Sequence, residues 1–213
     1  MSRTRSFIYK YRRVAYFAMF LIIGPAYFLT SSIDFERTLI HCALDDFIPF
    51  VPAVIVPYIL WYAYVPLVLA LVCFGAPEYF RRQCADFLGG ARFCILIFVL
   101  FPSAVDFRPE ALGGGLFNRI CRMIFESDRP VNVFPSLHCY EALCVHLTAF
   151  SVTSLRKKTA LRAVSAVMMT LICMSTVLVK QHSVLDVFAG CAVAAAAALI
   201  FNLRRHKNDN KTV

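Results

Sequence analysis

The chain has 213 residues, of which 60% are hydrophobic and only 16% are charged, and its mean hydropathy is +0.67. A soluble domain carries about 25% charged residues, so this composition excludes an ordinary soluble protein and indicates an integral membrane protein. The net charge of +9 is spread over several segments without a nucleic-acid motif. We therefore expect contact with anionic membrane lipids and no nucleic-acid partner.

Six hydrophobic segments qualify as candidate membrane-spanning helices, each of which needs about 20 mostly apolar residues. We expect one all-α integral membrane domain over residues 1–213, built as a bundle of six transmembrane helices. The first segment is interpreted as an uncleaved span and not as a signal peptide, because its apolar stretch is long and no clear cleavage site follows it. The predicted spans are approximately 14–33, 53–74, 91–105, 137–155, 160–180 and 184–203.

The placement of lysine and arginine predicts the orientation of these spans. Most of the 22 basic residues fall on one side of the six-span arrangement, and cytoplasmic loops are the ones enriched in them. Both termini are therefore predicted to be cytoplasmic, in a multi-pass protein of the cell membrane. The cytoplasmic set includes Arg81 and Arg82, which precede the third predicted span, and Arg92 at its start.

The longest connection, about 106–136, is expected on the outer side between spans three and four. Its stretch from Leu116 to Phe125 interleaves apolar residues with Arg119 and Arg122. This pattern predicts a helix lying in the outer membrane interface, where it would cover the site.

Nine cysteines, an odd number without a CxxC pair, lie mostly inside predicted spans. They indicate neither a zinc cluster nor a disulfide framework. Cys42 and Cys121 both fall on the predicted outer side and could pair. We expect no metal and no cofactor.

Three polar residues map to the outer side independently of one another. His138 begins the fourth span directly after Pro135 and Ser136, and a helix N-terminus offers free N–H groups to a phosphate, with Ser136 able to cap the helix or donate as well. His182 and Asp186 are four positions apart, so the carboxylate could orient one ring nitrogen while the other faces substrate. A single histidine at a span end is usually only an interfacial polar residue, but a carboxylate inside an apolar segment is costly and usually functional.

At these residues the chain resembles the type 2 phosphatidic acid phosphatase superfamily, whose motifs are Lys-x6-Arg-Pro, Pro-Ser-x-His and Ser-Arg-x5-His-x3-Asp on a six-helix membrane core. Pro135-Ser136-Leu137-His138 matches the second motif in full. Ser175, His182 and Asp186 match the third at the correct spacing, but Thr176 replaces its arginine. The resemblance covers a catalytic core of about 90–205.

The first motif has two candidates. Arg108-Pro109 follows the third predicted span but has Phe101 in the lysine position, whereas Arg129-Pro130 has Arg122 there and lies very close to the second motif. We expect Arg108 to be the main phosphate-binding arginine, with Arg129 as second choice.

The resemblance implies a metal-independent mechanism with a phosphohistidine intermediate. His182, oriented by Asp186, attacks phosphorus, His138 protonates the leaving oxygen, and water or an alcohol then takes the phosphoryl group. The phosphate contacts expected from this comparison are Arg108, Arg129, Ser136, Ser175 and Lys180, although Lys180 could instead extend to the membrane interface.

The function expected first is a membrane lipid phosphatase acting on a phosphomonoester or pyrophosphate. Thr176 replaces the motif arginine, which predicts weaker binding of a doubly charged phosphate. The alternative function is therefore a head-group phosphotransferase, similar to the branch that contains inositol phosphorylceramide and sphingomyelin synthases. A non-enzymatic membrane protein is the third hypothesis. Glu141, one helical turn after His138, is a further candidate for tuning that histidine.

Overall fold

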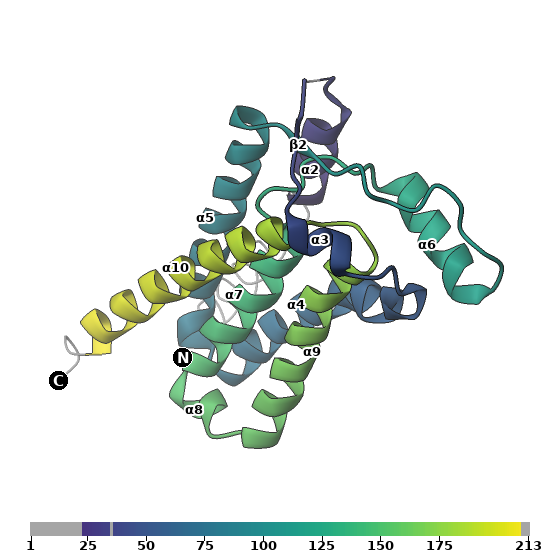
Figure 1. Cartoon of the computed structure of the whole chain (residues 1–213). Helices are drawn as coiled ribbons and strands as arrows, with labels where there is room; N and C mark the ends of the chain where they lie inside the picture. The colour runs from purple at the N-terminus through teal and green to yellow at the C-terminus, as the bar shows by residue number, and fades with distance from the viewer. Residues whose placement is uncertain (1–22, 35, 210–213) are drawn as a thin grey trace.

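The computed structural model describes residues 23–34 and 36–209, and most of these residues are helical (Figure 1). Two short strands, one 3-10 turn and nine α-helices follow one another within this part of the chain. In chain order they are α2 Ile23–Ser32, β1 Thr38–Leu39, α3 Ala43–Phe47, η2 Pro52–Val54, α4 Ile55–Gly75, α5 Pro77–Leu100, β2 Ser103–Ala104, α6 Leu116–Ser127, α7 Leu137–Ser151, α8 Thr153–Arg156, α9 Thr159–Leu178 and α10 Val184–Asp209.

Among the described residues, four helices are long and apolar enough to cross a membrane, which supports the expected membrane protein. They are Pro52–Gly75, Pro77–Leu100, Thr159–Leu178 and Val184–Arg204. The first, third and fourth coincide closely with the predicted spans 53–74, 160–180 and 184–203. Of the predicted span 14–33, only the part in α2 lies within the described residues. The predicted span 137–155 corresponds to α7 together with the short helix α8 that follows it, since α7 alone, with 15 residues, is shorter than the about 20 residues of a full crossing.

The prediction for the third span, 91–105, was wrong at both ends. The helix begins at Pro77 and ends at Leu100, because proline is favoured in the first turn of a helix and the polar residues that follow it continue the helix. Gln83 and Asp86 are buried in α5 and bind Thr148 and Arg204 on neighbouring helices. Arg81 and Arg82, which precede the predicted span, therefore lie on α5 together with Arg92.

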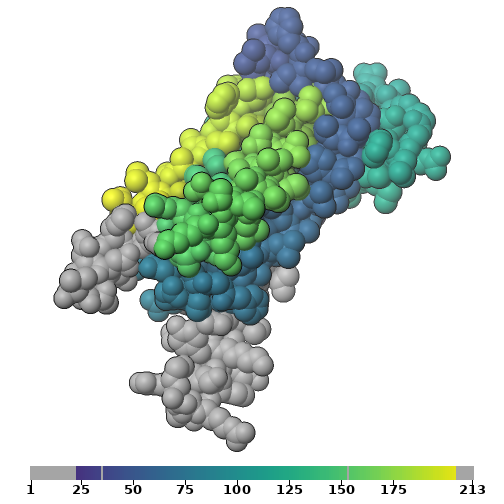
Figure 2. Space-filling view, turned by 90° about the horizontal axis from the view of Figure 1, so that it is seen from below, coloured from purple at the N-terminus to yellow at the C-terminus, as the bar shows by residue number. Residues whose placement is uncertain are grey.

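Helix α7 is the centre of the bundle and packs against α4, α5, α9 and α10. Figure 2, a view from below, shows α9 flanked by α10 on one side and α4 on the other. The contact between α7 and α10 is especially close at Gly190, where an added Cβ would lie 2.4 Å from the carbonyl oxygen of Ser136. A small residue here lets the two helices approach.

Helix α6 extends away from the bundle (Figure 1) and contains the amphipathic stretch expected from the sequence. Ile120, Cys121 and Ile124 pack against the start of α4 and against Val179, whereas Leu116 and Met123 are each 67% exposed. Cys121 and Cys42 both carry free thiols, so they do not form the disulfide that the sequence left open.

Candidate active site

The fold brings His138 and His182 together although they come from different helical elements. His138 is the second residue of α7, and His182 lies in the connection 179–183 between α9 and α10. Their ring centroids are 5.7 Å apart, and both residues line one cavity of about 440 Å³. The two predicted catalytic histidines thus share one cavity.

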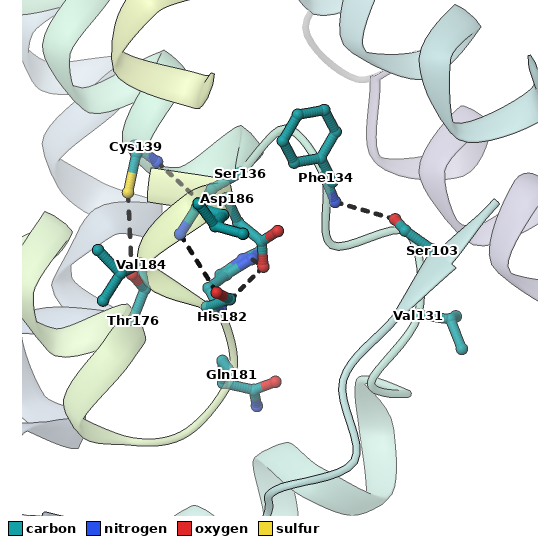
Figure 3. Close-up of polar contacts among 12 residues, drawn as sticks. Ser103, Val131, Phe134, Ser136, Cys139, Thr176, Gln181, His182, Val184 and Asp186 are labelled. Carbon is teal, nitrogen blue, oxygen red and sulfur yellow. Dashed lines mark hydrogen bonds and ion pairs between the residues drawn. The ribbon is translucent and has the colours of Figure 1, made fainter. Parts of the chain in front are cut away.

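Asp186 and His182 lie side by side in the folded chain. Its Oδ2 lies 3.4 Å from His182 Nδ1 and accepts a 2.8 Å hydrogen bond from the backbone N–H of Ser183. Figure 3 shows His182 and Asp186 beside Ser136, whose backbone N–H donates to the carbonyl of Asp186. His182 precedes the first residue of α10, so the pair forms at the helix entrance and not along one helix face.

The environment of His182 favours a charged imidazolium. Burial lowers the pKa of His182, but its hydrogen bond to Asp186 and the attraction of that carboxylate outweigh burial, so the pKa lies above its ordinary value. A carboxylate accepts hydrogen bonds, so Nδ1 carries the proton in the neutral ring and Nε2 keeps its lone pair. This arrangement suits a nucleophile whose positive charge grows during attack.

His138 lies against two aromatic rings and has a ring nitrogen free for a ligand. Its ring centroid is 4.6 Å from that of Tyr58 and 4.3 Å from that of Trp61. Among the described residues, His138 Nε2 has no hydrogen-bond partner, although it is buried. Ser136 caps α7 by accepting a 3.4 Å hydrogen bond from the N–H of Cys139. A buried, unpaired polar atom is costly, which favours a polar ligand beside His138.

The cavity is amphiphilic. Apolar residues of α2 and α4 line part of it, and polar residues from the segment 127–132, α7 and the His182 connection line the rest. This combination suits a molecule with a polar head and an apolar chain. The apolar lining includes Ile23, Phe28, Trp61, Val65 and Leu69, and the polar lining includes Asp128, Arg129, Asn132, His138, Glu141, Gln181 and His182.

The two candidate arginines of the first motif take different positions. Arg108 donates to the carbonyl of Asp128 at 2.9 Å and to Gln181 Oε1, but it is not among the residues that line the cavity. Arg129 does line the cavity, and its Nη1 donates to the carbonyl of Ser31 at 3.3 Å. Arg108 thus lies behind the cavity wall, where it holds the residue next to His182.

Ser175, Thr176 and Lys180 bind other parts of the protein and do not line the cavity. Ser175 and Thr176 donate to the carbonyls of Ile172 and Cys173 in their own helix. Lys180 Nζ donates to the carbonyl of Asp45 at 2.8 Å. Of the predicted phosphate contacts, Ser175 thus bonds within α9, whereas Lys180 joins the connection 179–183 to α3.

The sequence reasoning missed three residues near the histidines. Asp128 accepts hydrogen bonds from Tyr27 and Tyr58 at 2.8 and 3.3 Å. Gln181 and Trp61 line the cavity, and Gln181 Nε2 and Trp61 Nε1 are buried without a partner among the described residues. The position of Gln181 directly before His182 was the only sequence signal available for any of the three.

Comparison with known proteins gives one match. Residues 111–209 match the family model described as the PAP2 superfamily, and this segment contains His138, His182 and Asp186. Arg108 precedes the matched segment. No curated protein and no solved structure matches the chain.

Proposed function

We propose that this chain is a membrane enzyme that hydrolyses a lipid phosphomonoester or pyrophosphate, because its residues 111–209 match the family model of the PAP2 superfamily. The observation that carries this proposal is the pairing of His138 and His182 at one amphiphilic cavity. Phosphoryl transfer mainly requires correct positioning and stabilised charge, and both histidines are positioned here by buried contacts.

In the proposed first step, His182 Nε2 attacks phosphorus while Asp186 stabilises the imidazolium that forms. The bond between phosphorus and the leaving oxygen breaks, and His138 gives that oxygen a proton. In the second step, water attacks the phosphohistidine and His138 accepts its proton. The P–N bond then breaks, which releases inorganic phosphate and restores His182.

For the membrane arrangement, we propose six spans with the site at the outer face. Helices α7 and α10 both start at the site, and basic residues follow α7 at Arg156 to Lys158 and occupy the far end of α10 from Arg204 onward. Since positive charge favours the cytoplasmic side, the site end faces outward and both termini are cytoplasmic. Helix α6, with its exposed Leu116 and Met123, would then lie in the outer interface.

A head-group phosphotransferase is the second candidate, and the small positive charge of the cavity favours it. The lining contains one arginine, Arg129, beside the carboxylate of Asp128. Thr176 supplies no guanidinium, and Arg108 lies outside the lining. A phosphodiester carries one negative charge where a phosphomonoester carries nearly two, so it would meet less repulsion here.

The test uses detergent-purified protein in the presence of EDTA with a panel of lipid phosphates. Inorganic phosphate and product lipids are measured in the same reactions, with His182→Ala as the inactive variant and His146→Ala as a matched histidine control away from the cavity. Phosphate release lost only in His182→Ala would support the phosphatase. Lipids with exchanged head groups and no free phosphate would favour the transferase, and no product of either kind would contradict both.

A further inference from the structure

Helix α3 lies against the connection that carries His182, although the two are far apart in the sequence. This five-residue helix, Ala43–Phe47, carries Asp45, whose side chain faces inward and leaves the residue 2% exposed. A carboxylate this deeply buried needs hydrogen-bond donors. Its donors come mainly from the residues immediately after His182.

Asp45 binds residues that precede and follow His182 in the sequence. On the C-terminal side, Asp45 Oδ2 accepts from Ser183 Oγ at 2.6 Å and Oδ1 accepts from the N–H of Val184 at 2.9 Å. On the N-terminal side, the backbone carbonyl of Asp45 accepts from Lys180 Nζ at 2.8 Å. Lys180 has a φ of 59°, a left-handed backbone that is uncommon for a residue other than glycine. The connection is therefore held at both ends by one residue of α3.

Ser183 links Asp45 to the catalytic pair. Its hydroxyl donates to Asp45, and its backbone N–H donates to the same Asp186 oxygen that lies near His182 Nδ1. A shift of Ser183 would therefore move Asp186 relative to the imidazole ring. We propose that Asp45 is a positioning residue for the reaction, acting on His182 through Ser183 and Asp186. This inference rests on the proposed role of His182 as nucleophile.

The charge of Asp45 fits this role. Burial raises the pKa of Asp45, but hydrogen bonds from Ser183, Val184 and Cys42 outweigh burial, so the pKa lies below its ordinary value. The side chain is thus ionised at neutral pH. Its negative charge lies at the N-terminus of α10, where the helix dipole stabilises an anion.

The test compares Asp45→Asn with Asp46→Asn in the full-length protein. Asp46 is a matched control because its carboxylate is exposed and, among the described residues, binds only the side chain of His41. We expect Asp45→Asn to lower kcat by roughly 10- to 100-fold with KM within about twofold, since small misplacements of reacting groups can cost this much. Asp46→Asn should keep the wild-type kcat.

A double-mutant cycle separates positioning from general destabilisation. Ser183→Ala removes one hydrogen bond of the same chain of contacts, so its effect on kcat should not add to that of Asp45→Asn. Additive effects, or an unchanged kcat in folded Asp45→Asn, would overturn the proposal. If Asp45→Asn does not fold, a wild-type kcat in folded Ser183→Ala would overturn it.

A second measurement distinguishes this inference from the proposed function. Amide hydrogen exchange over residues 179–186 should accelerate in Asp45→Asn but not in Asp46→Asn. If the wild-type protein shows no turnover but the two variants differ in exchange, the proposed function is contradicted. The contact between α3 and the connection 179–183 is then still supported. Equal exchange in both variants would contradict the inference itself.

Discussion

Helix α7 carries two histidines whose surroundings differ sharply. His138, at its first turn, has a buried Nε2 without a partner in the described part of the chain, and it shares a cavity with His182. His146, further along the helix, has its Nδ1 2.9 Å from Ser165 Oγ. The same Ser165 hydroxyl lies 2.8 Å from the Tyr64 hydroxyl.

This difference shows which property marks a site inside a membrane. A serine and a histidine within hydrogen-bond distance are the residue types of a nucleophile and its base, yet Ser165 and His146 satisfy each other and neither lines the described cavity. Polar groups in a bilayer must find partners among themselves. Unpaired atoms at a cavity are therefore a better sign of function than the residue types alone.

The strongest test of this comparison replaces each histidine by glutamine. His138→Gln should lower kcat by about 10²- to 10⁴-fold, because a general acid contributes rate enhancements of this size. His146→Gln should keep kcat within about twofold. Steady-state kinetics on the same lipid substrate provides the measurement. Equal losses of kcat in both variants would show that lining the cavity does not make His138 more important for turnover than His146.

The pH profile tests the pairing of His182 with Asp186. Only the neutral ring can attack phosphorus, so activity should fall with decreasing pH through a pKa above the ordinary histidine value of about 6.5. Asp186→Asn should move this acid limb to lower pH and reduce the maximal rate by roughly 10²-fold. The pKa of His182 is raised in the folded state. His182 therefore stabilises the fold at pH values below its ordinary pKa, and this contribution is lost as the pH rises through the raised pKa. An unmoved limb in Asp186→Asn would argue that another group controls the profile.

Substitutions of Arg108 and Arg129 should have smaller effects on turnover, and the two should differ in whether kcat or KM changes. Arg108 holds Gln181 beside His182, so Arg108→Met should lower kcat about tenfold. Arg129 lines the cavity, so Arg129→Met should mainly raise KM for the lipid phosphate. Michaelis–Menten analysis of both variants separates the roles, and the reverse pattern would make Arg108 the residue that contacts substrate.

The smallest expected effect on turnover is at the His146 end of α7. Ser165→Ala removes the hydroxyl that both His146 and Tyr64 bind, so the free energy of unfolding should fall by about 1–3 kcal/mol. Turnover at permissive temperature should not change. Unfolding in detergent measures the first quantity, and a large loss of activity in folded protein would assign the His146 cluster a part in function.

The sequence predicted those features that depend on local patterns. Continuous apolar runs gave the spans at 53–74, 160–180 and 184–203, and the motif spacing correctly placed His182 next to Asp186. The third span was wrong because the charged residues at the start of α5 resemble a loop when their partners on other helices are unknown. Polar contacts between distant helices leave no periodic signal in a sequence.

The surroundings of the site could not be predicted for the same reason. Asp45 and Ser183 are 138 positions apart, and no pattern in the sequence connects them. Lys180 was expected either to contact phosphate through its positive charge or to extend to the membrane interface, but its ammonium group binds the carbonyl of Asp45. The partner of Lys180 is 135 positions away in the sequence, so the sequence did not indicate it.

The spacing of the two proposed catalytic histidines depends on the absence of a side chain at Gly190. A methyl group at Gly190 would meet the carbonyl oxygen of Ser136 at 2.4 Å and the Cβ of Cys139 at 3.3 Å. Helices α7 and α10 would then have to separate, and each helix brings one half of the site: His138 on the first, and Asp186 with the His182 connection on the second. The missing side chain of Gly190 thus sets how closely the proposed acid, His138, and the proposed nucleophile, His182, can approach the same substrate.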